Sequence, residues 1–348
     1  MLSRRQFMRG AGLLAGSLGL ASCASASAGG NSDSNESQVD EAVSLRAAAL
    51  KGPTAMGLVK FMSDVDSGVD VDAGSAARVD YSFQIVASAD EVTPLISKGE
   101  VDIAAVPANL ASVLYNKTEG AVRAICINTL GVLYICELGD SIQTVADLRG
   151  KTIYSAGKGS TPEYALEYVL EAAGLDPASD VTIEWKSEHS ECVTALAADA
   201  AAVAMLPQPF VTTAQAKNDQ IRVALDLNAE WKAACEAKGD DGRLITGVAI
   251  ARTEFAEAHP EAVEAFLRHY QESVDYVTSN VAEAAKLVGD YGIVTEEVAA
   301  KALPACNITF ITGSEMRARL ESYLAVLESQ NAQAVGGKLP GDDFYFGA

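Results

Sequence analysis

The feature that most limits how this chain folds is its repeated alternation of short apolar runs with segments of helical periodicity. The runs at 43–50, 79–87 and 101–106 are typical of strands, whereas 54–65 has the pattern of a helix and another helix begins at Pro107. Strands that alternate with helices favour α/β folds in which the helices cover the faces of a sheet. We therefore expect an α/β architecture with a largely parallel sheet.

A second set of the same kind follows a fourth run at 124–127 and a fifth at 132–136. Its predicted strands lie at 152–156, 181–185, 201–206 and 221–227, and its predicted helices at 162–173, near 192–198 and from Gln208. Each set can bury its own core, since about 300 residues are enough for two domains of medium size. The second set is expected to form a separate lobe.

The chain then returns to the first set through a predicted strand at 246–250. Apolar stripes predict helices afterwards at 260–276, 281–291, 295–303 and 314–329. These patterns predict a first lobe formed by residues 43–129 and 246–348 and a second lobe formed by residues 130–245. Two crossover segments, near 128–134 and 226–246, would form a hinge.

Four predicted turns between a strand and a helix carry the candidate binding residues. Ligands of open α/β sheets gather at the carboxyl ends of strands, where such turns lie. The candidates are Thr54 and Met56 in the first turn, Asn109 beside Pro107 in the second, Ser160 and Thr161 in the third, and Gln208 beside Pro209 in the fourth. For each residue taken singly, helix capping or core packing is an equally good interpretation.

The loop at 157–162, with sequence GKGSTP, has the strongest local chemistry. Glycines let a backbone approach a ligand closely, and Ser160 or Thr161 can cap the following helix. Pro162 suits the first helical turn, where a missing N–H has no cost. The free N–H groups of that turn attract anions, although a plain capped helix explains the same residues.

Motifs for other functions fail on spacing. The segment 150–152 resembles the end of a phosphate-binding loop, but Val145 stands where the first glycine is required, and the loop at 157–162 lacks the third glycine of a dinucleotide fingerprint. No G-x-S-x-G or H-E-x-x-H sequence is present. His189 and Cys192 could share a helical face as metal ligands, but two residues make a weak site. We expect no catalytic residue, metal or cofactor.

Charge and cysteine content narrow the function further. The formal net charge of −21 repels nucleic-acid phosphates, so no nucleic-acid partner is expected. An enclosed site could still bind a small anion through backbone N–H groups. Five cysteines follow residue 23 without any C-x-x-C pair, and the odd number leaves their pairing open: Cys126, Cys136, Cys192, Cys235 and Cys306.

The first twenty-three residues have the pattern of an export signal. Arg4 and Arg5 precede an uncharged run at 10–20, and the run is too short for the ~20 residues of a spanning helix, which disfavours an uncleaved anchor. The arginine pair resembles a twin-arginine signal. The sequence LASC that ends at Cys23 resembles a lipobox, in which this cysteine is lipidated. Residues 24–42 are polar and predict a flexible tether.

Over roughly residues 43–329, the chain resembles the extracellular solute-binding lipoproteins of ABC importers, in particular the group for nitrate, sulfonates, taurine and thiamine pyrimidine precursors. The likeness rests on LKGPT at 50–54, VDIAAVP at 101–107, LRGKT at 148–152 with GKGST at 157–161, and GVAIAR at 247–252 with the helix at 260–276. It implies a two-lobed fold like that of type II periplasmic binding proteins. It also implies a solute cleft lined by Thr54, Asn109, Ser160 and Thr161, and less firmly by Met56 and Gln208.

The resemblance implies a protein that captures a small organic solute, such as a sulfonate or a pyrimidine-like compound, and delivers it to an ABC permease and its ATPase. A lipid on Cys23 would hold it on the outer side of the cell membrane. The predicted turns contain no obvious arginine, which disfavours a simple inorganic anion. An exported enzyme of the same fold that acts on a small metabolite is the alternative, disfavoured because the cysteine-rich run of the family's pyrimidine-synthesising relatives is absent.

Overall fold

A computed structural model describes residues 42–73, 78–199, 201–240 and 242–348. The predicted leader at 1–23, with Cys23, and residues 24–41 of the predicted tether lie outside these ranges. Among the described residues, no helix combines the length and apolar character that crossing a membrane requires.

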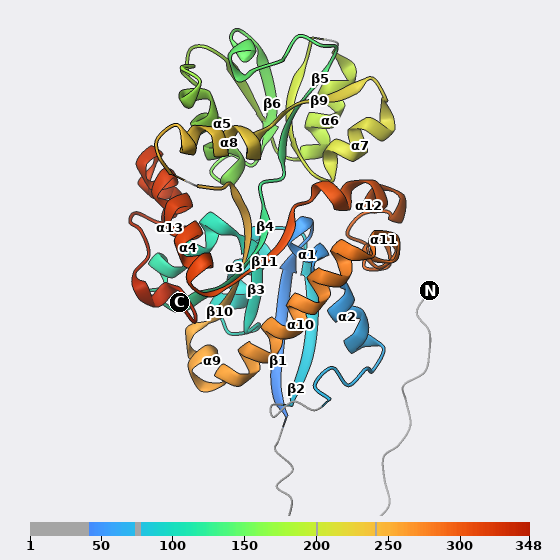
Figure 1. Ribbon diagram of the computed structural model, residues 1–348, viewed down its shortest axis with the longest axis vertical. Helices are drawn as coiled ribbons and strands as arrows, with labels where there is room; N and C mark the ends of the chain where they lie inside the picture. Colours follow the sequence, from blue (N-terminus) through green and yellow to red (C-terminus); the bar gives the residue numbers. More distant parts are fainter. Residues whose placement is uncertain (1–41, 74–77, 200, 241) are drawn as a thin grey trace, which may run out of the picture. The chain divides into compact units, whose positions relative to one another are not determined.

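Six strands form the first sheet, in the spatial order β11, β4, β10, β3, β1 and β2 (Figure 1). β1 pairs in parallel with β2 and β3, whereas β10 is antiparallel to β3 and β4, and β11 is antiparallel to β4. Strands β1 to β4 therefore run in one direction. The bounds are β1 Val43–Leu50, β2 Val79–Val86, β3 Ile103–Pro107, β4 Val122–Leu130, β10 Ile245–Arg252 and β11 Ile308–Ile311.

Five strands form the second sheet, in the order β7, β6, β8, β5 and β9. β6 is parallel to β7 and β8, while β5 is antiparallel to β8 and β9. Strands β6 to β9 thus share one direction, opposite to that of β5. The bounds are β5 Leu133–Leu138, β6 Thr152–Ala156, β7 Thr182–Lys186, β8 Val203–Pro207 and β9 Ile221–Asp226.

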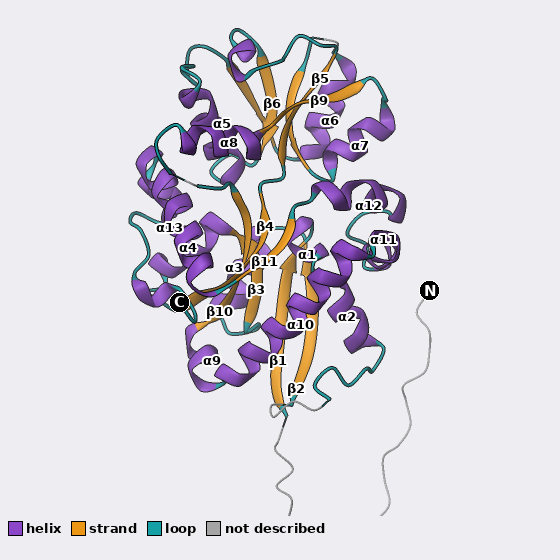
Figure 2. Ribbon diagram, viewed as in Figure 1, coloured by secondary structure: helices purple, strands orange, loops and turns teal. Residues whose placement is uncertain are grey.

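Helices flank both sheets (Figure 2). The first lobe comprises the first sheet with α1 Pro53–Met56, α2 Val59–Asp66, α3 Ala89–Ser97, α4 Ala108–Lys117, α9 Thr253–Ala258, α10 Pro260–Ser279, α11 Val281–Asp290, α12 Glu296–Ala302 and α13 Gly313–Gln330. The second lobe comprises the second sheet with α5 Thr161–Ala172, α6 His189–Ala198, α7 Phe210–Lys217 and α8 Leu227–Glu236. The predicted α/β class is confirmed, although α3, α8, α9 and β11 were not predicted.

The prediction of a largely parallel sheet was wrong, because each sheet is mixed. The physical reason is the path of the chain between the lobes. β5 begins at Leu133, only a short step after β4 ends at Leu130, and β10 enters the first sheet after the return from α8. A strand that enters a sheet from the junction runs against the strands that point toward it. Alternation of apolar runs does not encode this direction.

The predicted helix at 54–65 is also interrupted, into α1 and α2. The Ser273 hydroxyl of α10 lies at the break, where it donates to the Gly57 carbonyl at 2.7 Å and accepts from the Phe61 N–H at 3.1 Å. Gly57 is closely surrounded, since a β-carbon there would lie 3.1 Å from Ile308 and 3.3 Å from Tyr270. A partner more than two hundred residues away replaces the helical hydrogen bonds at this point.

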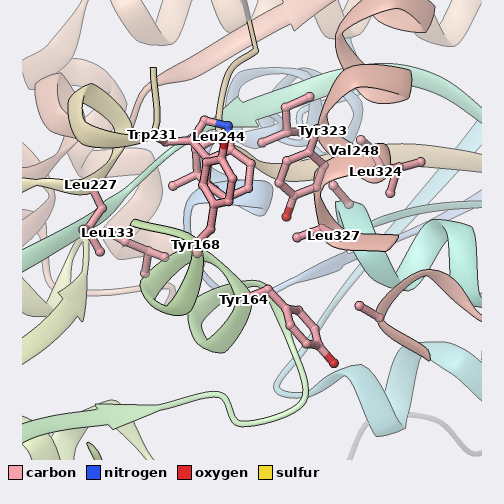
Figure 3. Packing of buried hydrophobic residues seen from close by; sticks show 14 of the residues in the cluster. Leu133, Tyr164, Tyr168, Leu227, Trp231, Leu244, Val248, Tyr323, Leu324 and Leu327 are labelled. Carbon is pink, nitrogen blue, oxygen red and sulfur yellow. The ribbon is translucent and has the colours of Figure 1, made fainter. Parts of the chain in front are cut away.

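One hydrophobic cluster extends across both lobes (Figure 3). Trp231 of α8 packs between Tyr168 of α5 and Tyr323 of α13, with ring centroids 4.4 Å and 5.6 Å away. Trp231 and Tyr323 are fully buried, and aromatic pairs of this kind add stability beyond their buried area. We call these three residues the interlobe cluster. They join the last long helix of the first lobe to the second lobe.

All five cysteines of the described residues are buried and free. Burial raises the pKa of Cys126, Cys136 and Cys306 to about 12. Thiols in such surroundings are poorly reactive, because the thiolate is the reactive form. The sequence left the disulfide pairing open, and in the structure these five cysteines form no disulfide with one another.

Gly247 of β10 marks a tight contact beside the junction between the lobes. A β-carbon at this position would lie 2.4 Å from Thr54 Cγ2 and 2.5 Å from Asn128 Oδ1. We predict that Gly247→Ala lowers the free energy of unfolding by about 1–3 kcal/mol, the range typical of overpacked sites, as measured by urea denaturation.

Gly289→Ala in α11 is the matched control for this prediction. The nearest atom to its β-carbon would be Glu296 N at 3.1 Å, a milder contact than the two at Gly247. This contact is offset by the higher helix propensity of alanine, which is worth up to about 1 kcal/mol. We expect this control to be close to neutral. Equal losses in the two variants would contradict the proposed contact at Gly247.

Candidate functional site

A cavity of about 240 Å³ lies between the two lobes. The carboxyl ends of β1 to β4 and of β6 to β9 point toward the junction, so the turns that follow these strands meet there. The lining residues come from both lobes and from the connection between β4 and β5: residues 50–54, Pro107, Val132, Leu133, Gly157, residues 160–162, His189, residues 207–210 and Thr246.

Four of the six predicted binding residues line this cavity: Thr54, Ser160, Thr161 and Gln208. Their polar atoms also have partners within the protein. Thr54 Oγ1 donates to the Leu50 carbonyl at 2.8 Å, and Ser160 Oγ donates to the Gly157 carbonyl at 2.7 Å. Gln208 Oε1 accepts from Thr212 Oγ1 at 2.9 Å. These bonds hold the turns in the shapes that form the walls.

Gly157 and Gly159 give the third turn its conformation. Both have positive φ angles, 89° and 78°, which favour glycine. A β-carbon on Gly157 would lie 2.9 Å from Pro162 Cγ. The Gly159 N–H donates to Glu163 Oε2 at 2.6 Å. The loop is thereby folded against the start of α5, with Ser160 at the N-terminal cap position.

Asn109 and Met56 are the two predicted residues that do not line the cavity. Met56 is fully buried in the core of the first lobe. Asn109 lies on α4, and its Oδ1 accepts from Thr161 Oγ1 of α5 at 3.3 Å. Thr161 Oγ1 also lies 3.1 Å from Tyr323 Oη of α13. Asn109 therefore takes part in a buried hydrogen-bonded bridge between the lobes.

His189 lines the cavity but was not predicted as a binding residue. It begins α6, and its ring lies 5.2 Å from that of Phe210. Its Nδ1 atom is buried and has no hydrogen-bond partner among the described residues. Burial lowers the pKa of His189 to about 4, so the ring is neutral at pH 7. Its position could have been found from the sequence, because His189 follows the predicted strand at 181–185 in the same way that the other candidate residues follow their predicted strands.

Thr246 is a second polar lining residue without a partner. Its Oγ1 atom is buried and unsatisfied among the described residues, and it comes from β10 of the first lobe. Buried polar groups in folded proteins are nearly always hydrogen-bonded. His189 Nδ1 and Thr246 Oγ1 thus come from opposite lobes, on residues that line one cavity. A ligand in the cavity could supply the hydrogen bonds that these two atoms lack.

The rest of the lining is mostly apolar. Five of the ten prolines of the chain contribute to it, together with Leu50, Val132, Leu133 and Phe210. Lys51, which is exposed, carries the single formal charge among the described lining residues. Helices α5, α6 and α7 begin at this wall, and their N-terminal ends contribute partial positive charge.

The described residues contain no group of three or more His, Cys, Asp or Glu side chains that could hold a metal ion. Cys192, considered with His189 as a metal-ligand pair, is buried, and its Sγ faces the Glu188 carbonyl at 3.8 Å. The arrangement suits the capture of a small molecule by hydrogen bonds and apolar contact.

The chain is similar in sequence to a known protein family. The family profile described as "ABC transporter, phosphonate, periplasmic substrate-binding protein" matches residues 74–300. No curated protein sequence matches the chain.

Solved structures share the fold across most of the chain. An ABC transporter structure from Parabacteroides distasonis has a TM-score of 0.70 at 21% identity, covering 88% of this chain and 99% of that one. The periplasmic aliphatic sulphonate binding protein SsuA from Escherichia coli has a TM-score of 0.68 at 16% identity, covering 86% and 93%. The alkanesulfonate-binding protein SsuA from Xanthomonas axonopodis pv. citri, bound to MOPS, has a TM-score of 0.60 at 17% identity, covering 86% and 96%.

The two-lobed arrangement expected from the sequence is thus confirmed as the fold of periplasmic binding proteins. The profile covers well over half of the chain. The chain belongs to the family of ABC-transporter phosphonate-type periplasmic substrate-binding proteins.

Proposed function

We propose that this protein captures a small organic solute in the cavity between its lobes and delivers it to an ABC permease and its ATPase. The proposal rests on a cavity to which both lobes contribute strand-to-helix turns. A ligand bound there would touch both lobes, so occupancy would favour the arrangement in which they are together.

The volume of the cavity limits the size of the solute. Cavities that hold drug-sized ligands have volumes of roughly 300–1,000 Å³, whereas this one has about 240 Å³. A solute of a few heavy atoms fits this space. Such a molecule has little apolar area to bury, so its affinity depends on a small number of well-placed polar contacts.

The wall of the second lobe is the part of the cavity suited to a polar head group. Ser160 and His189 stand at the starts of α5 and α6, where helix N-termini favour oxyanions. The family description names phosphonates, and two of the similar structures are sulphonate-binding proteins. Both head groups are compact oxyanions on carbon. We infer that the head group of the solute is an organic oxyanion of this type.

Attachment to the membrane is the remaining part of the proposal. The chain would be lipidated at Cys23 and held on the outer side of the membrane beside its importer, joined to its lobes by the polar tether. Metabolic labelling with a radioactive fatty acid tests this directly. Label retained after Cys23→Ala would contradict the assignment.

We predict that a thermal-shift screen of sulfonates, phosphonates, nitrate, pyrimidines and small carboxylates finds a ligand that raises the melting temperature, because a ligand of the folded state stabilises it by mass action. Ser160→Ala combined with Thr161→Ala should weaken this ligand at least tenfold. Thr194→Ala, which removes an exposed hydroxyl of α6, is the control. A ligand bound equally well by all variants would place the site elsewhere.

We predict that His189 makes the affinity for an anionic ligand depend on pH. A bound oxyanion favours the protonated imidazole and so raises the pKa of His189 from its value of about 4. The complex then binds more protons than the free protein, and affinity rises as the pH falls from 7 to 5. Isothermal titration calorimetry of wild type and His189→Gln measures this. Identical pH profiles would remove His189 from the head-group site.

We also predict an effect of His189 on the stability of the unliganded protein. The imidazole stays neutral in the folded state down to about pH 4, whereas an unfolded histidine titrates near 6.5. The unfolded state therefore binds more protons between these values, and stability falls as the pH drops through this range, by up to about 3 kcal/mol. Urea denaturation at several pH values should give a shallower fall for His189→Gln. Parallel curves would contradict a neutral His189 ring in the folded state.

A further inference from the structure

The described residues that line the cavity include no carboxylate. This is notable in a chain with 47 acidic residues and a net charge of −21. Two acids directly adjoin lining residues in the sequence, and neither lines the cavity. Glu163 Oε2 accepts from the Gly159 N–H at 2.6 Å, and Glu188 Oε2 accepts from Ser190 Oγ at 3.1 Å. The site is thus formed without the side chains that balance a positive charge.

The other described residues of the cavity wall provide no negative charge in place of the missing carboxylates. The side chains of Leu50, Val132 and Leu133 are hydrocarbon, and so are the proline rings of the lining. The aromatic rings in the described lining are those of Phe210 and His189, which lie against each other with centroids 5.2 Å apart. An ammonium group moved from water into such surroundings loses its hydration and meets only neutral acceptors, such as Thr246 Oγ1, without a carboxylate to balance its charge, which disfavours its binding.

Lys51 adds to this effect. This exposed residue lies in the turn after β1 and has the only formally charged side chain among the described lining residues. A second positive charge in the same small space would be repelled by it, whereas an oxyanion would be attracted. Charge and desolvation therefore act in the same direction.

We propose, on the basis of the function proposed above, that the solute carries a short apolar substituent without an ammonium group, and that the acid-free lining rejects the amino-substituted analogue. The rejected class includes ω-amino sulfonates, ω-amino phosphonates and zwitterionic amino acids. The accepted class consists of short-chain organic oxyanions whose substituent is alkyl or otherwise uncharged.

The test uses pairs of compounds that differ only in the amino group. Ethanesulfonate is compared with 2-aminoethanesulfonate, and ethylphosphonate with 2-aminoethylphosphonate, by isothermal titration calorimetry on the full-length protein at pH 7. Each pair keeps the head group and the chain length constant. We expect the uncharged member of at least one pair to bind at least tenfold more tightly than its amino partner.

A single added carboxylate should change this preference. Thr54 lines the cavity from the short helix α1. Thr54→Asp is expected to reduce the ratio of affinities within a pair at least fivefold, by weakening the uncharged member and strengthening the amino member. Thr54→Asn matches the shape of aspartate without its charge, and it should change both affinities in parallel.

The outcomes separate this inference from the function on which it rests. Amino compounds that bind as tightly as their uncharged partners, or more tightly, would overturn the inference and leave the proposed function in place. A chain that binds no member of these pairs and shows no thermal shift with the wider panel would overturn the proposed function as well. An unchanged ratio in Thr54→Asp, in a variant whose melting temperature equals that of Thr54→Asn, would also count against the inference.

Discussion

The short connection between β4 and β5 determines the directions of the strands on which the cavity depends. β4 leaves the first sheet at Leu130 and β5 enters the second at Leu133, so the carboxyl end of one strand meets the amino end of the other. A β-carbon on Gly131 would lie 2.7 Å from Asn228 Cβ. The Gly131 carbonyl accepts from Asn307 Nδ2 at 2.5 Å. With this step fixed, the turns after β1, β3, β6 and β8 all face one space.

Much of the fold and part of the candidate site could be predicted from the sequence, for a definite physical reason. Strand and helix periodicity are local, so β1 and β6 were located to the residue, and the rule that ligands gather at carboxyl ends led to Thr54, Ser160, Thr161 and Gln208, which line the cavity. Strand direction, the break between α1 and α2, and the partners of Asn109 depend on residues far away in the sequence. A periodic pattern does not contain that information.

His189 illustrates a different limit. Its position after a predicted strand was visible, but its chemistry was interpreted only as a possible metal ligand, because a lone histidine in a sequence has no obvious partner. Its burial and its unsatisfied Nδ1 atom become evident only when α6 and Phe210 are placed together. The sequence was enough to place His189 after a strand, but its proposed role in the cavity depends on how the surrounding residues pack.

The interlobe cluster has a consequence for optical spectroscopy. Trp231 is one of two tryptophans in the chain, and it is enclosed by rings from both lobes. The other, Trp185, lies on β7 at the edge of the second sheet. Water admitted between α8 and α13 would shift the emission of Trp231 to longer wavelength. Because Trp185 lies outside this contact, replacing it by phenylalanine would leave one tryptophan, whose emission would follow the separation of the lobes in real time without an attached dye.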